Sequence, residues 1–158
     1  MNKYIFDSHV HSENSFDACD SVISLCEGAI KNGVNGFSIT DHLEVQEYNE
    51  EYENNITKSH KDVREAAELF KNKLRIRTGI EMAQPLQDIK TAEMILEKFP
   101  CDFIIGSMHS VKNEKDFYFM KKCDFEYRVD ELLTKYYEEY YEMVKWGKFD
   151  VIGHITYP

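Results

Sequence analysis

Short apolar runs alternate along this chain with longer segments in which apolar residues recur at helical spacing. The runs lie at residues 4–6, 36–40, 74–80, 103–105 and 151–153, and each has the length of one buried strand. Between them, apolar side chains recur every three or four residues, which predicts an amphipathic helix after each of the first four runs. This alternation predicts an α/β protein with a parallel sheet. No linker divides the 158 residues, so we expect one domain.

Local signals predict where several helices begin and end. Asp20 and Ser21 can cap the first helix, which is expected to stop near Gly33. A polar stretch at residues 44–55 should lead into the second helix, with its acidic part at residues 46–53 exposed to solvent. We place His60 on a solvated face of that second helix. The third helix should end before Pro100.

The fourth helix follows an aromatic insertion at residues 117–125. Its expected buried face consists of Val129, Leu132, Leu133, Tyr136, Tyr140 and Val144. The tyrosines in this helix would also suit a partner surface, but packing of the helix against the sheet explains them more simply.

Five of the six histidines stand where an apolar run ends. These residues are His9 and His11 after the first run, His42 after the second, His109 after the fourth and His154 after the fifth. Glu81 occupies the end of the third run, which has no histidine. Because the carboxyl ends of parallel strands in a barrel converge on one rim, these side chains should be neighbours. Isolated core histidines would have no reason to share this position, so the pattern predicts a site for several metal ions and metal-assisted hydrolysis.

The spacing within the first motif supports a metal site. His9 and His11 are two residues apart, so on an extended segment both imidazoles can face one ion. Asp17 supplies a carboxylate in the following loop, and Asp7 can orient a histidine. Glu81 has two oxygens and can bridge a pair of cations. A buried glutamate at a strand end otherwise needs a cationic partner.

Composition restricts the class of partner. The net charge of −10 argues against a basic surface that binds nucleic acid. A small phosphorylated substrate is compatible with it, because bound cations reverse the sign of the field inside a pocket. No apolar run approaches the length of a membrane span, and Asp7 interrupts the first run before a signal peptide develops, so we expect a cytoplasmic protein without a membrane partner. The sequence makes no prediction about the oligomeric state.

Taken together, these motifs resemble the PHP (polymerase and histidinol phosphatase) superfamily, and within it the histidinol-phosphatase-like branch. The matching motifs span the chain in family order: Asp7-Ser8-His9-Val10-His11, Asp17, Thr40-Asp41-His42, Gly79-Ile80-Glu81, Gly106-Ser107-Met108-His109-Ser110 and Gly153-His154. The resemblance implies a distorted, TIM-like (β/α)7 barrel, of which about five β/α units are present. It also implies up to three metal ions at the carboxyl-terminal face.

The resemblance also implies a role for each candidate residue. The implied ligands are His9, His11 and Glu81 for a first metal, Glu81, His109 and His154 for a second, and Asp17 and His42 for a third. Zinc, iron and manganese all suit these ligands. The candidate catalytic residues are Glu81, His109 and Asp41. We interpret Asp41 as a group that orients a neighbour, with a general acid as the alternative.

The activity implied is that of a metal-dependent phosphomonoesterase, which hydrolyses L-histidinol phosphate to L-histidinol and phosphate in histidine biosynthesis. Family members also carry a late D-x-H motif and an arginine after the G-H motif. Neither occurs here, and Thr156 stands where many relatives have aspartate. We therefore expect residues 1–158 to form a PHP phosphoesterase domain that is incomplete at its C-terminal end. The alternatives are a PHP-type phosphoesterase for a nucleotide or a phosphotyrosyl protein, and a non-catalytic metal-binding or regulatory module.

Overall fold

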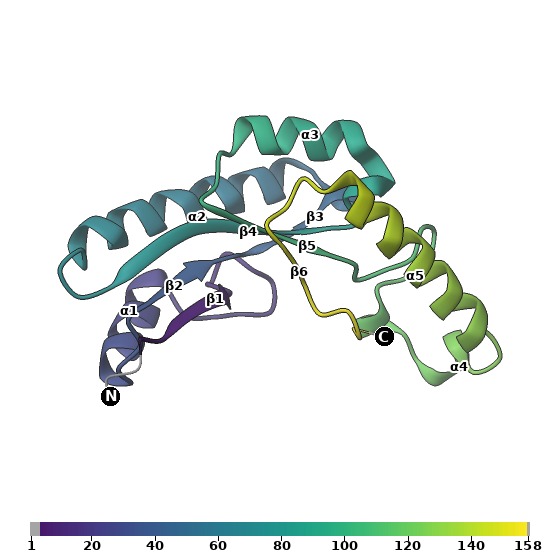
Figure 1. The fold of residues 1–158 in the computed structure, drawn as a ribbon, viewed down its shortest axis with the longest axis horizontal. Coiled ribbons are helices and arrows are strands. Elements are labelled where there is room, and N and C mark those ends of the chain that lie inside the picture. Colours follow the sequence, from purple (N-terminus) through teal and green to yellow (C-terminus); the bar gives the residue numbers. More distant parts are fainter. Residues whose placement is uncertain (1–3, 158) are drawn as a thin grey trace.

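The computed structural model describes residues 4–157, so residues 1–3 and 158 of the expected domain lie outside the described part. Its centre is a six-stranded sheet in which every pair of neighbouring strands is parallel. The strands are β1 (Phe6–Val10), β2 (Gly36–Ile39), β3 (His42–Glu44), β4 (Arg75–Ala83), β5 (Phe103–Ser107) and β6 (Val151–Ile152). Their order is β1-β2-β4-β5-β6, and β3 also pairs with β4. The sheet and its helices form an arch, which is half of a barrel (Figure 1).

Helices connect the strands and cover the outer side of the arch. They are α1 (Val22–Lys31), α2 (Glu50–Leu69), α3 (Ile89–Lys98), α4 (Lys122–Phe125) and α5 (Val129–Trp146). Figure 1 shows α2 and α3 along the top of the arch and α5 along its right side. The predicted alternation of strands and helices is therefore confirmed. None of the described helices combines the length and the apolar character that a membrane span requires.

Three apolar clusters hold the helices to the sheet. The first joins α1 and α2 to β2, the second joins α2 and α3 to β3 and β4, and the third packs α5 against the segment after β5. On α5 the buried residues are Leu132, Tyr136, Tyr140 and Met143. The two tyrosines are core residues, as predicted. Val129 and Val144, which we expected on the same face, are each 43% exposed, and Met143 is buried instead of Val144.

The start and end of α1 follow the sequence signals. The Ser21 side chain accepts a hydrogen bond from the backbone N–H of Ser24, which satisfies one of the free donors in the first turn. The helix ends at Lys31, and Gly33 follows it with a φ of +73°, a conformation that costs glycine little.

The polar stretch at residues 44–55 leads into the second helix, as predicted, but part of it already belongs to that helix. Helix α2 begins inside it, at Glu50, because the Asn49 side chain accepts hydrogen bonds from the backbone N–H groups of Glu51 and Tyr52. Acidic side chains in that first turn also interact favourably with the positive end of the helix dipole. At the other end of the stretch, Glu44 belongs to strand β3 and is buried.

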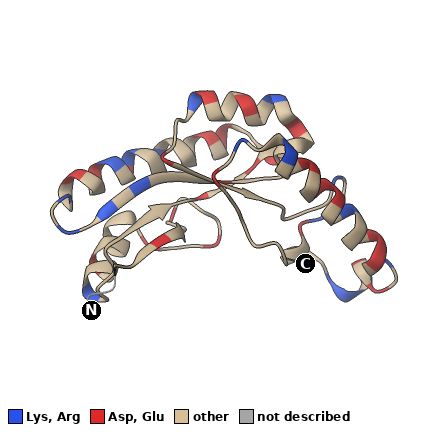
Figure 2. Ribbon diagram, in the orientation of Figure 1, with Lys and Arg blue, Asp and Glu red and all other residues tan. Residues whose placement is uncertain are grey.

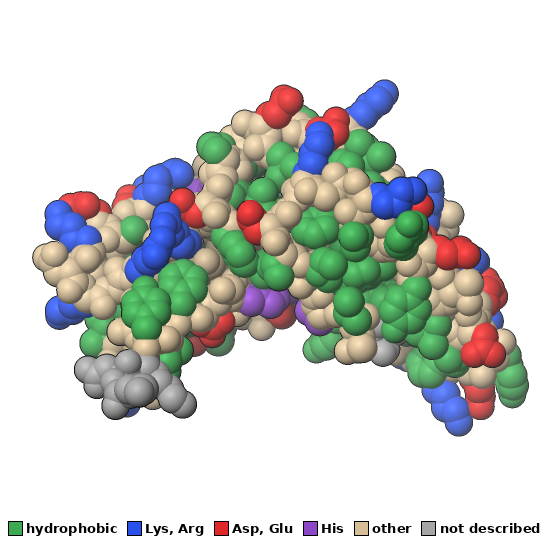
Figure 3. Space-filling view, in the orientation of Figure 1, with side chains coloured by type: hydrophobic (Ala, Val, Ile, Leu, Met, Phe, Trp, Pro, Cys, Tyr) green, Lys and Arg blue, Asp and Glu red, His purple; other side chains and the backbone are tan. Residues whose placement is uncertain are grey.

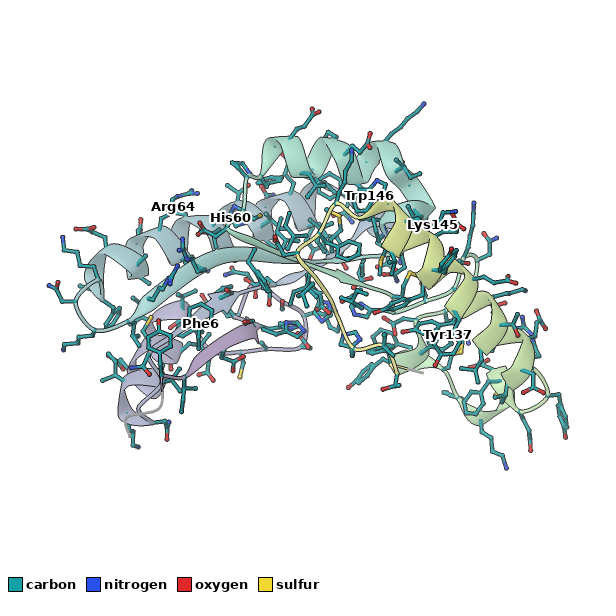
Figure 4. All side chains as sticks on the ribbon, viewed as in Figure 1. Phe6, His60, Arg64, Tyr137, Lys145 and Trp146 are labelled. Carbon is teal, nitrogen blue, oxygen red and sulfur yellow. The ribbon has the colours of Figure 1, made fainter. Side chains whose placement is uncertain are left out.

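The solvated position predicted for His60 is also wrong. This side chain is only 4% exposed, and its ring packs edge-on against Phe99. Its Nε2 lies 3.7 Å from the Cys101 sulfur. Burial lowers the pKa of His60, and the nearby charge of Arg64 lowers it further. His60 lies on α2, outside the group of strand-end histidines (Figure 4).

The two outer strands are less buried than the apolar runs suggested. Tyr4 and Ile5 are 64% and 45% exposed, and β1 begins only at Phe6, so that His9 lies within the strand instead of after it. Val151 in β6 is 43% exposed. Among the strands of residues 4–157, β1 and β6 each have a neighbour on one side only, so their side chains are less covered than those of β2 or β4.

Candidate metal centre

The carboxyl ends of the strands meet in the hollow of the arch, where Figure 3 shows a group of histidine side chains. Strand pairing brings these residues together. The β3–β4 register places His42 beside Glu81, and the β4–β5 register places Glu81 beside Ile105, four residues before His109. His9 lies in β1, and His154 follows β6. Side chains that are remote in sequence therefore face one another at one rim, as the sequence pattern predicted.

Glu81 lies at the centre of this group and is fully buried. Its Oε1 atom is 3.0 Å from the Nε2 of His154, 3.3 Å from the Nε2 of His109 and 3.5 Å from the Nε2 of His9. Its Oε2 atom is 3.2 Å from the Nε2 of His11. Four imidazoles thus present the same nitrogen to one carboxylate, and this is the arrangement expected of ligands around bound cations.

The opposite nitrogen of three of these rings is held by an oxygen atom. The pairs are His9 Nδ1 with Thr40 Oγ1 at 2.8 Å, His11 Nδ1 with Asp17 Oδ1 at 3.0 Å, and His109 Nδ1 with Glu44 Oε1 at 2.8 Å. Such contacts fix the ring orientation, and in a neutral ring a carboxylate on Nδ1 favours the tautomer whose Nε2 carries no proton. The rings are therefore oriented before any cation arrives.

His42 is placed differently from the other four histidines. Its Nδ1 lies 3.3 Å from Glu81 Oε2 and 3.2 Å from Glu44 Oε1. Its Nε2 lies 3.5 Å from Asp17 Oδ2. His42 therefore lies between the buried Glu81 and the more exposed Asp17.

All seven predicted ligands fall into three groups of potential ligand atoms, each group lying within 4.8 Å. The groups are His9 with Glu81 and His154, His11 with Asp17 and His42, and His42 with Glu81 and His109. Each could hold a metal ion. The partition differs from the one that the family resemblance implied, in which His9 and His11 share an ion.

Two buried atoms test whether the residues fit a cation. His42 Nδ1 and Glu81 Oε2 have no hydrogen-bond partner within the described part of the chain, although they lie 3.3 Å apart. Leaving a buried polar atom unsatisfied costs about 1–3 kcal/mol. A cation that accepts both lone pairs would remove this cost, so the donor set fits a divalent metal.

In the metal-free protein, contacts between carboxylates and protonated imidazoles stabilise the cluster. Burial alone would raise the pKa of Glu81, but the hydrogen bonds with His109 and the neighbouring rings hold it well below its usual range. Burial alone would lower the pKa of His11, yet the neighbouring carboxylates of Glu81 and Asp17 raise it to about 9. For His109, hydrogen bonds with Glu44 and Glu81 likewise outweigh burial and raise the pKa to about 10. Metal ions must therefore displace protons when they bind.

Asp41 does not point into this cluster. Its buried carboxylate accepts hydrogen bonds from the backbone N–H and the hydroxyl of Ser12 and from the hydroxyls of Ser15 and Ser59. The Ser15 hydroxyl in turn accepts a hydrogen bond from the backbone N–H of His42. The Asp41 side chain therefore reaches a predicted ligand only indirectly, through Ser15, whereas its backbone carbonyl accepts a hydrogen bond from the N–H of Glu81.

Three residues close to the cluster had no role in the sequence prediction. Ser107 donates a hydrogen bond to Glu81 Oε1, Thr40 contacts His9, and Glu44 contacts His42 and His109. Thr40 and Ser107 stand inside the motifs that carry the family resemblance, but neither residue has a chemical signal of its own. Glu44 had a weak signal, since the polar, apolar, polar order of His42, Leu43 and Glu44 is that of a strand with one buried face.

The amino-acid sequence of this chain is similar to those of known proteins. A model of the PHP domain matches residues 7–158. A protein of Deinococcus radiodurans named probable histidinol-phosphatase is 25% identical over 164 residues, which cover 96% of this chain and 60% of the relative. The histidinol-phosphatase of Lactococcus lactis is 25% identical over 105 residues, covering 66% of this chain and 39% of the relative.

The crystal structure of a histidinol phosphate phosphatase from Lactococcus lactis, in complex with zinc, L-histidinol and phosphate, has a similar fold. The TM-score is 0.77 at 21% identity, and the match covers 97% of this chain and 58% of that chain. The predicted TIM-like barrel with about five β/α units is confirmed by this likeness. The chain spans less than two thirds of the length of each of these relatives.

Proposed function

The chain belongs to the PHP domain family, and on that premise we propose that residues 1–158 form a metal-dependent phosphoesterase domain acting on phosphate monoesters. The observation that carries the proposal is the convergence of four imidazole Nε2 atoms on the carboxylate of Glu81, all within 3.5 Å. A fully buried carboxylate ringed by imidazoles would serve little purpose in an ordinary core. It is suited to hold more than one cation, since each of its oxygens can bind a different ion.

The proposal assigns the metal ions to the seven predicted ligands. These are His9, His11, Asp17, His42, Glu81, His109 and His154. Zinc, iron or manganese would lower the pKa of a water molecule and offset the charge that grows on the phosphate oxygens. Glu81 and His109 would take part in catalysis by binding the metal ions next to the phosphate group of the substrate. Asp41 would act through Ser15 by fixing the backbone of His42.

We propose L-histidinol phosphate as the substrate. The support comes from the names of the two relatives and from the L-histidinol and phosphate bound in the Lactococcus lactis structure. Cavities of about 470 and 400 Å³, lined in part by Glu44 and by His42, lie beside the cluster and have the size of small-molecule sites. Figure 2 shows acidic residues among the basic ones along the helices, and together with the net charge of −10 this favours a small substrate over nucleic acid.

A panel of phosphate monoesters tests the proposal. The chain is desalted, its bound metal is measured by elemental analysis, and it is then assayed with added zinc, manganese or iron. We expect at least about half an equivalent of metal, because a site with three ligands is normally tight. We also expect L-histidinol phosphate to be hydrolysed faster than a nucleoside monophosphate, phosphotyrosine or p-nitrophenyl phosphate.

The outcomes separate the alternatives. Preference for a nucleotide or for phosphotyrosine would retain the phosphoesterase and replace the substrate. Metal binding without turnover of any ester would favour a non-catalytic metal-binding or regulatory module. A chain that neither contains metal nor takes it up would overturn the assignment of the site. Any hydrolysis should be lost in Glu81→Gln and retained in Glu97→Gln, whose side chain is exposed on α3.

A further inference from the structure

Glu44 is a buried carboxylate beside the metal centre but outside the predicted ligand set. Strand β3 pairs with β4 so that His42 lies opposite Glu81 and Glu44 lies opposite Ala83. Side chains alternate between the two faces of a strand, so His42 and Glu44 share the face that carries the cluster. Leu43 points the other way and is fully buried in the core. The pairing of β3 with β4 therefore determines the position of Glu44.

Glu44 contacts the His109 ring at Nδ1, the nitrogen that faces away from Glu81. Glu44 Oε1 is 2.8 Å from His109 Nδ1, whereas His109 Nε2 is 3.3 Å from Glu81 Oε1. The ring thus lies between two carboxylates, with one nitrogen facing each. His109 is 1% exposed and Glu44 is 5% exposed, so water does not compete for these contacts.

A purely structural role does not account for this residue well. A buried carboxylate is costly unless it is paired and its oxygens are satisfied. Glu44 has one oxygen engaged, while its Oε2 has no hydrogen-bond partner among the described residues. Glu44 also does not have the position of a direct metal ligand, because the four histidine Nε2 atoms converge on Glu81 and not on Glu44.

We propose that Glu44 is a positioning residue for the metal centre, which accepts the Nδ1–H of His109 and thereby holds the His109 Nε2 lone pair toward the Glu81 site. This inference rests on the proposed function, since it requires that the cluster binds metal. The physical effect is general: a carboxylate on the second nitrogen of a ligating imidazole fixes the tautomer and the ring orientation, and it raises the basicity of the ligand.

The first test uses the unaltered chain. In the zinc-loaded protein labelled with ¹⁵N, long-range ¹H–¹⁵N correlation spectra identify which nitrogen of His109 carries the proton, with the signals assigned from their loss in His109→Gln. We expect the proton on Nδ1 and zinc on Nε2. A proton on Nε2, or zinc on Nδ1, would overturn the proposal. This measurement decides the question even if a Glu44 variant does not fold.

The second test measures zinc affinity by competition with a chelator. Glu44→Gln keeps the size of the side chain and removes its charge, and we expect the affinity of the site that contains His109 to fall about 10–100-fold. The matched control is Glu47→Gln, the same change three residues away on an exposed side chain, which should bind zinc as the unaltered chain does.

The results distinguish this inference from the proposed function. Equal zinc affinity in Glu44→Gln and in the unaltered chain would overturn the positioning role and leave the metal centre intact. A lower unfolding temperature of the metal-free variant without a loss of zinc affinity would also overturn it, because that is the result of a structural role alone. An unaltered chain that takes up no zinc would overturn both.

Discussion

Replacing Glu81 with glutamine tests the centre of the site, because the change keeps the shape of the side chain and removes its charge. All five candidate histidines lie within 3.5 Å of this carboxylate. The amide of glutamine also brings an N–H group into a position that only a lone pair can fill. We expect the variant to fold but to bind fewer metal ions, each more weakly.

The size of the effect follows from the three groups of ligand atoms. Glu81 belongs to two of them, and the group of His11, Asp17 and His42 does not contain it. Glu81→Gln should therefore abolish tight binding at two sites and spare the third. Loss of an outer partner of a ligand already costs 10–100-fold in affinity, so loss of the ligand itself should cost at least about 100-fold. At 1.4 kcal/mol for each tenfold change, that is about 2.8 kcal/mol for each affected site.

The assay counts metal equivalents by elemental analysis after desalting and measures affinity by competition with a chelator. Glu97→Gln is the matched control, since Glu97 is an exposed glutamate on α3. His60→Ala would be a poor control, because His60 is buried and its loss would disturb packing. If Glu81→Gln kept the stoichiometry and affinity of the unaltered chain, the central role of this carboxylate would be refuted.

Two further predictions concern protons and a glycine. Metal affinity should rise with pH toward 9, and metal uptake at pH 7 should release protons, because the pKa values of His11 and His109 are raised to about 9 and about 10 in the metal-free protein. Titration calorimetry in two buffers of different ionisation enthalpy counts these protons. Uptake without proton release would contradict the displacement of protons by the metal ions. Gly153→Ala should lower metal loading, because the added Cβ would lie 2.2 Å from the Ser107 hydroxyl that donates to Glu81. The control is Gly28→Ala in α1, where a Cβ meets nothing within 4 Å, so metal loading should stay unchanged. Thermal unfolding should show this control stabilised by up to about 1 kcal/mol. Equal metal loading in the two glycine variants would contradict the role of Ser107.

Glu44 illustrates why part of the site could not be predicted from the sequence. A three-residue strand is too short for its alternation to stand out, and the glutamate that ends it is followed by a polar, acidic stretch. Only pairing of β3 with β4 shows that the side chain faces His109, which is 65 residues away in the chain. The burial of His60 has a similar origin, since it depends on where α2 lies against Phe99 and Cys101.

From the amino-acid pattern alone we could predict the alternation of strands and helices, the cap of α1 and the gathering of five histidines and Glu81 at one rim. These features are local or follow from a general property of parallel sheets, so they need no knowledge of the register. The packed fold is needed to know which nitrogen of each ring faces Glu81 and which oxygen contacts the other nitrogen. It also shows that the Asp41 carboxylate accepts its hydrogen bonds from serines. Such choices depend on distances of a few ångströms between strands, and those distances are set only when the sheet and its helices pack together.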